Sequence, residues 1–243
     1  MVNNLPLELL EGLFPNHCAL CGLRSHRRVP LCHDCEREMP LNSSHCKRCA
    51  IPLPVGTGKL TERLCGHCLE KPPPFERVIA PWLYGEYLAY LIQQWKYHGE
   101  RRLTTLLAAL WQQQAALDSA IDVLVPVPLH WRRRWQRGFN QSELLSRQLL
   151  ANCTQLKNCK LGQRMVKRVR PTAAQSTMGA RRRIVNLEDA FTVRQPCDNL
   201  RVAIVDDVFT TGATAVALAR ALSAAGAVYI EVWCLARTPA PGG

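Results

Sequence analysis

The sequence lacks the features of a membrane-spanning or exported protein. No stretch of its 243 residues approaches the about eighteen consecutive apolar residues that a transmembrane helix needs. The N-terminal segment MVNNLPLELLEGLF has neither the basic start nor the small-residue cleavage pattern of a secretory signal. We therefore expect no membrane span and a cytoplasmic location. The length allows one substantial domain and a second, small one.

Acidic residues are also scarce, above all in one part of the chain. Lys and Arg number 31 against 19 Asp and Glu, which gives a formal net charge of +12. Between residues 131 and 183, fourteen basic residues accompany a single acid, Glu143. A local positive field of this kind attracts polyanions and phosphorylated ligands. The composition therefore favours nucleic acids or phosphate-bearing small molecules as partners.

Cysteine is concentrated near the N-terminus, where eight of the twelve precede residue 69. These eight form four pairs, and every pair has two intervening residues. This spacing lets both thiolates of a pair bind one tetrahedral ion, as in zinc knuckles and ribbons. The predicted metal ligands are Cys18, Cys21, Cys32, Cys35, Cys46, Cys49, Cys65 and Cys68.

The pairs predict one or two structural Zn²⁺ ions, and their spacing leaves sequential and interleaved pairing equally open. A disulfide framework is disfavoured because cytosolic thiols are kept reduced. Four copies without a surrounding strand and helix pattern are too many for a thioredoxin-like redox site. Four complete pairs also favour a place outside the ligand set for each histidine that adjoins a cysteine, namely His17, His33, His45 and His67.

The run Pro72–Pro74 separates two regions of different pattern. It can neither continue a helix nor donate to a strand ladder, so it predicts a stiff spacer. We expect a Cys-rich zinc-binding module over residues 1–75 and an α/β domain over residues 76–243.

Strands and helices are expected to alternate in the second domain, which implies right-handed crossovers and a mainly parallel sheet. The apolar runs at 77–84, 121–129, 201–205 and 228–236 favour strands. Helical spacing covers 86–100, 101–117, 142–152 and 213–225, with a break at Gly99 between the first two.

The stretch VAIVDDVFTTGAT, residues 202–214, combines chemistry for two kinds of group. Asp206 and Asp207 follow a buried strand and leave the sheet at its carboxyl end, where ligands bind in such folds. The next helix begins near Gly212, so backbone N–H groups and its partial positive charge suit a phosphate. Ionised carboxylates suit ribose hydroxyls or hydrated Mg²⁺. Solvated loop acids and a simple helix cap would explain the threonines but not the whole combination.

This stretch resembles the phosphoribosyl pyrophosphate loop of type I phosphoribosyltransferases. The resemblance implies that Asp206 and Asp207 contact ribose hydroxyls, and it places VPVPLH, residues 125–130, on the pyrophosphate side. It also implies a type I phosphoribosyltransferase-like α/β fold, which would follow the small double zinc ribbon predicted from the cysteine pairs. The implied phosphate contacts are Thr210, Thr211, Gly212 and Thr214.

The chain as a whole resembles the ComF/GntX family of DNA-utilisation and competence proteins. The resemblance runs from the cysteine pairs through RRRWQRGFNQSELL (132–145) and RPTAAQSTMGARRRIVN (170–186) to the loop just described. It implies use or processing of external DNA, as nutrient or in natural competence. It also implies single-stranded DNA, a phosphoribosyl ligand, and DNA-uptake or recombination proteins as partners.

Basic residues and aromatics alternate in WRRRWQRGFN, residues 131–140, as expected of a track for single-stranded nucleic acid. The spacing of Trp131, Trp135 and Phe139 places them on one helical face, which fits stacking against bases and core packing equally well. Asn140 and Gln141 suit contacts with nucleic acid or the cap of the next helix. The predicted nucleic-acid contacts are Arg132, Arg133, Arg134, Arg137, Arg181, Arg182 and Arg183.

Three functions remain open from the sequence. The first is a binder of single-stranded DNA and a phosphoribosyl ligand. The second is a Mg²⁺-dependent phosphoribosyltransferase of nucleotide metabolism, for which the sequence offers arginines but no identifiable base pocket or general base. The third is a zinc-ribbon adaptor for uptake proteins, because zinc ribbons commonly make protein contacts.

Overall fold

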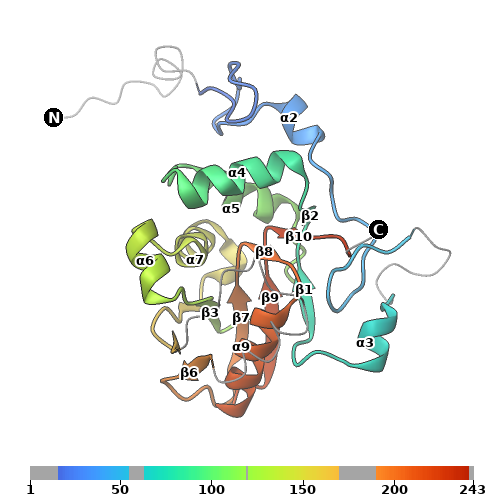
Figure 1. The fold of residues 1–243 in the computed structure, drawn as a ribbon, viewed down its shortest axis with the longest axis vertical. Helices are drawn as coiled ribbons and strands as arrows, with labels where there is room; N and C mark the ends of the chain where they lie inside the picture. Colours follow the sequence, from blue (N-terminus) through green and yellow to red (C-terminus); the bar gives the residue numbers. More distant parts are fainter. Residues whose placement is uncertain (1–15, 55–62, 119, 170–189, 241–243) are drawn as a thin grey trace.

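The computed structural model of the protein describes residues 16–54, 63–118, 120–169 and 190–240. The Cys-rich segment contains the short helices α2 (His33–Arg37) and α3 (Gly66–Glu70) and precedes an α/β sheet (Figure 1). Within the described ranges, no helix is long and apolar enough to cross a membrane.

The main sheet has five strands in the order β1-β9-β7-β3-β4, and every neighbouring pair is parallel. This sheet confirms the predicted α/β class with a mainly parallel sheet. It also brings the start of the second domain next to its end, because β1 pairs with β9. The strands are β1 (Arg77–Ile79), β9 (Tyr229–Trp233), β7 (Arg201–Val205), β3 (Val123–Pro126) and β4 (Lys160–Leu161).

Three of these strands continue beyond a two-residue break as a second, smaller parallel sheet. Its order is β2-β10-β8, with β2 (Trp82–Leu83), β10 (Ala236–Arg237) and β8 (Val208–Phe209). Asp206 and Asp207 occupy the break between β7 and β8. Hydrogen bonds bridge it, since the Asp206 N–H donates to the Trp233 carbonyl at 2.9 Å and the Leu235 N–H to the Asp207 carbonyl at 3.0 Å. The two acids are therefore held by the sheet.

Helices cover both faces of the main sheet (Figure 1). Alternate residues of β7 separate into the two cores, with Ala203 and Val205 in one and Val202 and Ile204 in the other, as a period of two requires. The first core contains residues of α4 (Glu86–Tyr97), α5 (Leu103–Gln114) and α7 (Gln141–Asn152), and the second contains residues of α9 (Ala213–Ala224). This arrangement leaves the carboxyl ends of β3 and β7 between the helix layers.

The predicted elements are present, including the break expected between two helices at Gly99. The helices α4 and α5 are separated at Gly99, which has φ of +71°. The stretch 77–84 forms two strands where one was expected, because the chain breaks between β1 and β2. The structure adds α6 (Trp131–Arg137), the 3₁₀ helix η2 (Thr154–Leu156) and an antiparallel pair, β5 (Val166–Arg168) with β6 (Phe191–Val193).

The Cys-rich module packs against the outer edge of β2. Leu41 forms an antiparallel bridge with Trp82. The Asn42 N–H donates to the Pro81 carbonyl at 2.7 Å, and the Asn42 side-chain amide donates to the Ala80 carbonyl at 3.2 Å. The module thus covers part of an edge that would otherwise expose unpaired backbone groups. The boundary near residue 75 stays a prediction.

Candidate metal clusters and phosphoribosyl site

The eight cysteines of the four pairs gather into two separate groups, each with its four sulfur atoms within 4.8 Å of one another. The pairing is sequential, so each group uses two neighbouring CxxC pairs. The Cys21 and Cys32 sulfurs lie 3.9 Å apart, and the Cys49 and Cys65 sulfurs 3.7 Å apart. We call Cys18, Cys21, Cys32 and Cys35 the first cluster, and Cys46, Cys49, Cys65 and Cys68 the second cluster.

Backbone N–H groups point at the sulfurs of both clusters. The Cys35 N–H donates to the Cys32 sulfur at 3.5 Å, and the Cys65 N–H donates to the Cys46 sulfur at 3.3 Å. Although burial opposes ionisation, backbone N–H groups lower the pKa of Cys18 to about 6 and that of Cys46 to about 7.

Four sulfur donors at tetrahedral spacing fit structural Zn²⁺ and leave no open coordination position for catalysis. The two clusters therefore support structural zinc, as predicted. None of the four histidines that adjoin a cysteine belongs to either group of the described residues. The ring nitrogen of His45 instead lies 2.5 Å from the Asn42 carbonyl oxygen.

The two acids in the break after β7 have different partners. Asp207 is only 6% exposed, and both of its carboxylate oxygens are engaged. Lys96 Nζ, at the end of α4, lies 2.6 Å from Oδ1, and Gln141 Nε2, at the start of α7, donates to Oδ2 at 2.7 Å. Burial disfavours the charged ammonium, but Asp207 and Asp206 outweigh it and raise the pKa of Lys96. Asp207 is thus one half of a buried ion pair.

Asp206 is less enclosed than Asp207. Its Oδ1 accepts hydrogen bonds from the Asp207 N–H at 2.9 Å and from the Ser142 hydroxyl at 3.3 Å. Burial and the adjacent charge of Asp207 raise the pKa of Asp206 to about 7. The pKa of Asp206 therefore lies near neutral pH, while Asp207 forms the ion pair with Lys96.

The predicted phosphate contacts form the turn into α9. Gly212 has φ of +77°, a left-handed conformation that favours glycine. A Cβ there would lie 2.6 Å from Cζ of Phe209, so packing inside the turn also requires glycine. The first N–H groups of α9 lack carbonyl partners within the helix and point outward with the positive end of its dipole.

The loop after β3 lies beside this turn, because Pro126 is paired with Val205 and the Val127 N–H donates to the Val205 carbonyl at 2.9 Å. The structure thus brings VPVPLH and the acid loop to the same edge. His130, at the end of that loop, is buried.

The predicted arginines are only partly described. Arg133, Arg134 and Arg137 lie on α6, directly after VPVPLH, and Arg134 is exposed. Arg137 Nη1 donates to the Gln141 side-chain oxygen at 2.7 Å, and its guanidinium lies 5.0 Å from the centre of the Tyr97 ring. The side chain of Arg132 and the cluster Arg181, Arg182 and Arg183 lie outside the described residues.

The aromatics of this segment have separate environments. Trp135 is 86% exposed on α6, whereas Phe139 is buried. The expectation of one shared helical face is wrong for Phe139, because α6 ends at Arg137 and the chain turns at Gly138, where φ is +76°. Asn140 caps α7, since its side-chain oxygen accepts from the Ser142 N–H at 3.1 Å.

Several functional candidates carry no signal in the sequence alone. Lys96 ends an ordinary amphipathic helix, and Arg237 lies in the last described strand. Burial and the charge of Arg133 lower the pKa of Arg168 on β5, and the charge of Asp206 opposes them. Arg168 therefore lies near the site. Ser142 was expected only as the beginning of a helix.

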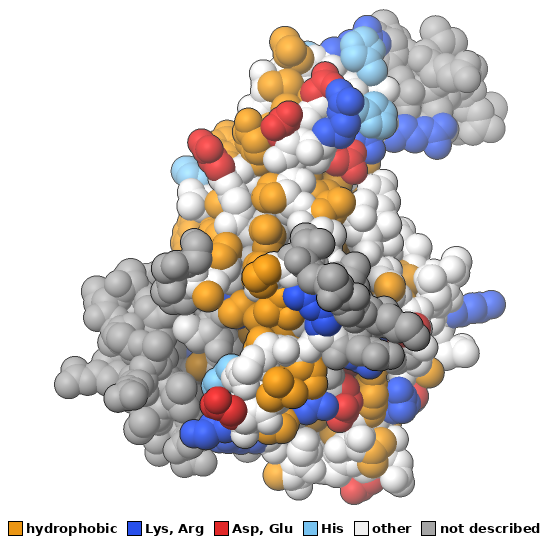
Figure 2. Space-filling view, turned by 90° about the vertical axis from the view of Figure 1, so that its right-hand side faces the viewer, with side chains coloured by type: hydrophobic (Ala, Val, Ile, Leu, Met, Phe, Trp, Pro, Cys, Tyr) orange, Lys and Arg blue, Asp and Glu red, His pale blue; other side chains and the backbone are white. Residues whose placement is uncertain are grey.

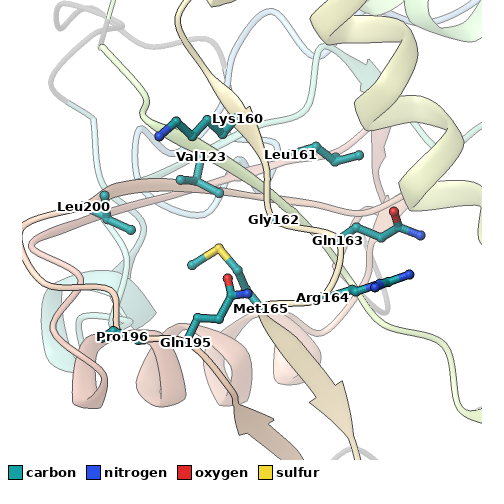
Figure 3. A pocket seen from close by; sticks show the side chains of 10 residues that line it. All are labelled: Val123, Lys160, Leu161, Gly162, Gln163, Arg164, Met165, Gln195, Pro196 and Leu200. Atoms are coloured by element: carbon teal, nitrogen blue, oxygen red, sulfur yellow. The ribbon is translucent and has the colours of Figure 1, made fainter.

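Two cavities lie away from the acid loop. One of about 430 Å³ opens at the start of β3 and is lined by Lys160, Arg164 and Met165 among others (Figure 3). Another of about 530 Å³ lies between the Cys-rich module and β1. Neither cavity includes Asp206 or Asp207 in its lining.

Charge is mixed on the face opposite α6. Figure 2, which looks from the side of α3, shows Lys and Arg scattered among hydrophobic and acidic side chains. The helix α6 lies on the other side of the molecule in Figure 1.

Comparisons with known proteins cover both parts of the chain. Residues 9–75 match the double zinc ribbon domain. The DNA utilization protein YhgH of Salmonella typhi is 37% identical over 92% of this chain and 98% of its own length, and that of Escherichia coli K12 is 35% identical over the same shares. Competence protein F of Haemophilus influenzae is 33% identical over 94% of this chain and 100% of its own.

Among solved structures, a purine phosphoribosyltransferase from Pyrococcus horikoshii Ot3 matches at 20% identity, over 56% of this chain and 70% of its own. The TM-score is 0.31, a value too low to assign a fold. The α/β class instead rests on the strand order and the two helix layers.

Proposed function

This chain belongs to the family of the DNA utilization protein YhgH and competence protein F, and from that membership we propose a function in the use of external DNA. The protein binds single-stranded DNA along α6 and holds a phosphoribosyl group at the acid loop after β7. It acts in the cytoplasm, where DNA-uptake or recombination proteins deliver or receive the strand.

One observation carries the proposal: a chain of hydrogen bonds joins the basic helix to the acid loop. Arg137 Nη1 donates to the side-chain oxygen of Gln141, and Gln141 Nε2 donates to Asp207 Oδ2, each at 2.7 Å. Arg137 and the acid loop therefore belong to one hydrogen-bonded network. A nucleotide presents both a phosphate for the cations and a sugar for the carboxylates.

The acid loop and the start of α9 would bind different parts of that sugar phosphate. Asp206 is the more accessible acid, so its free oxygen is the better acceptor for a ribose hydroxyl. The start of α9 offers N–H groups to a phosphate. Mg²⁺, when bound with phosphoribosyl pyrophosphate, would neutralise part of the pyrophosphate charge. Asp206 would be the carboxylate that accepts hydrogen bonds from the water molecules around Mg²⁺.

A titration of labelled single-stranded DNA at several salt concentrations tests the DNA site. We expect the double variant Arg133→Gln, Arg134→Gln to bind more weakly. The slope of log affinity against log salt should also become shallower by roughly 0.7 for each lost phosphate contact.

Lys157→Gln is the matched control, because this exposed lysine belongs to the same basic segment but precedes β4 at the amino end of the strands. Its affinity and salt slope should equal those of the wild type. Equal slopes for the double variant and the wild type would reject α6 as the DNA site.

Phosphoribosyl transfer is the second candidate function, and the raised pKa of Asp206 favours it. A carboxyl group with a pKa of about 7 can exchange a proton at neutral pH, which general acid–base chemistry requires. The test is consumption of phosphoribosyl pyrophosphate with Mg²⁺ and a panel of bases. Turnover by the wild type that is lost in Asp206→Asn would establish this activity. Binding without turnover for every base supports the DNA-handling function alone.

A further inference from the structure

Arg237, at the end of β10, bridges the second cysteine cluster and the phosphate turn. Its side chain is buried, with 7% exposure. Nε donates to the Cys49 carbonyl at 3.1 Å. Nη1 donates to the carbonyls of Phe209 and Thr210 at 3.1 and 2.7 Å, and to Thr238 at its own end of the chain. One guanidinium thus ties a cluster cysteine to the turn that precedes α9.

Contacts continue from Arg237 into the turn itself. The guanidinium lies 5.1 Å from the centre of the Phe209 ring. The same ring fills the space where a Cβ of Gly212 would lie. Phe75, which follows the Pro72–Pro74 run, packs edge-on against Phe209 at 6.1 Å between ring centres. A displacement of Arg237 would therefore change the packing at Gly212, where α9 begins.

The positive charge of Arg237 also connects it to the second cluster. A buried guanidinium is costly without a nearby negative charge. Among the ion pairs of the described residues, none joins Arg237 to a carboxylate. Arg237 instead contacts the second cluster, through the hydrogen bond from Nε to the Cys49 carbonyl. Four thiolates around Zn²⁺ carry a net charge of −2, which would hold the guanidinium in place.

The first cluster has different neighbours. Cys18 and Leu31 belong to the core that contains residues of α4 and α5, and the hydrogen bonds of Arg237 involve none of the four cysteines of the first cluster. The two clusters thus offer an internal comparison, because they share ligand type and spacing but only the second adjoins the turn.

We propose that Arg237 is a positioning residue that couples metal binding at the second cluster to the grip of the phosphate turn. Zinc at Cys46, Cys49, Cys65 and Cys68 orients Arg237, and Arg237 holds the carbonyls of Phe209 and Thr210 so that the turn is shaped for a phosphoribosyl phosphate. This inference rests on the proposed phosphoribosyl binding for its ligand, but the link from cluster to turn is testable without one.

The ligand-free test is amide hydrogen exchange of residues 208–216 in zinc-loaded full-length protein. We expect Cys49→Ser and Arg237→Gln to increase exchange in this segment at least fivefold. Cys21→Ser, at the exposed cysteine of the first cluster, should leave it unchanged. Zinc content by metal analysis should remain at the wild-type level in Arg237→Gln, which separates loss of the link from loss of the metal.

The ligand test uses the reciprocity of coupled sites. Phosphoribosyl pyrophosphate with Mg²⁺ should slow zinc transfer from the second cluster to a chromogenic chelator. The ligand should raise the equilibrium affinity of the second cluster for zinc by some factor. The affinity for phosphoribosyl pyrophosphate should fall by the same factor in Cys49→Ser. Arg237→Gln should bind both zinc and the ligand but show no coupling, and Arg237→Lys should restore part of it by restoring the charge. A merely structural role for Arg237 would weaken binding and leave the coupling intact.

The outcomes separate the two proposals. Failure of zinc-loaded wild-type protein to bind phosphoribosyl pyrophosphate would refute the phosphoribosyl part of the proposed function, while the exchange experiment would still decide the link. Equal exchange in wild type, Cys49→Ser and Arg237→Gln would overturn the inference. So would ligand affinity that is independent of zinc at the second cluster.

Discussion

The cysteine clusters and the acid loop after β7 differ in where their partners lie along the chain. Each cluster takes its four thiols from one continuous stretch, residues 18–35 or 46–68. The acid loop takes its partners from Lys96 and Gln141, which are 111 and 66 residues away from Asp207. A site whose ligands are close in sequence can be predicted from their spacing. When a site is assembled from distant segments, only the residues of its motif can be recognised in the sequence.

Metal removal should separate the two regions most strongly. Structural zinc contributes on the order of 10 kcal/mol to folding in small zinc domains, because its ligands form no site in the unfolded chain. We expect chelation under reducing conditions to unfold residues 16–54 and 63–70, as judged by limited proteolysis. The parallel sheet should keep its far-UV circular dichroism. A module that stays protected after complete zinc loss would show that local closure does not depend on metal.

Breaking the long-range ion pair should have the next largest effect. Lys96→Met leaves the buried Asp207 carboxylate without its cation, which costs about 3–5 kcal/mol. Urea unfolding should show this loss, whereas Lys71→Met, at an exposed lysine, should change stability by less than about 0.5 kcal/mol. The double variant Lys96→Met, Asp207→Asn should be more stable than the sum of its single variants predicts. Additive losses would mean that the two groups do not interact.

The pH dependence of stability sharpens the comparison further. The folded pKa of Asp206, about 7, lies above the unfolded value of 3.8, so between these values the folded state binds the additional proton. Asp206 therefore lowers stability as the pH rises through this window, by up to about 1.4 kcal/mol per pH unit, and has no further effect above it. Asp206→Asn should remove this slope. Parallel stability curves for the variant and the wild type from pH 4 to 8 would contradict the raised pKa.

The smallest effect is expected where a local cap meets a long-range contact. Asn140→Ala removes the cap on the Ser142 N–H and the 3.0 Å hydrogen bond to the Val127 carbonyl, and should cost about 1–2 kcal/mol. Asn140→Asp keeps the capping oxygen but loses the donor to Val127. It should therefore lose only the long-range part, as measured by urea unfolding. Equal stability of both variants would assign the whole effect to the hydrogen bond to the Val127 carbonyl.

Most of the fold could be predicted because its signals are local. The run 201–205 is β7, and 213–225 predicts α9 to within one residue. The break between β1 and β2 could not be predicted, because an apolar run does not show where a strand changes sheets. The face shared by the aromatics was wrong for Phe139, since Gly138 ends the helical path first.

The candidate site was predictable only on its motif side. Asp206 and Asp207 are adjacent to each other, but their partners Lys96, Gln141 and Ser142 are brought to the loop by the packing of α4 and α7. The same holds for Arg237, whose role depends on the pairing of β10 with β8. The assignment of the phosphoribosyl and DNA contacts stays a prediction.

The exposure of Trp135 makes the proposed DNA surface visible to ordinary fluorescence. The other tryptophans with described side chains, Trp82, Trp95, Trp111 and Trp233, are all buried at 3% or less. Their emission belongs at shorter wavelength, whereas an indole in water emits at longer wavelength and is accessible to soluble quenchers. The red edge of the spectrum therefore reports on α6 without any label, and a strand that covers this helix would shield it.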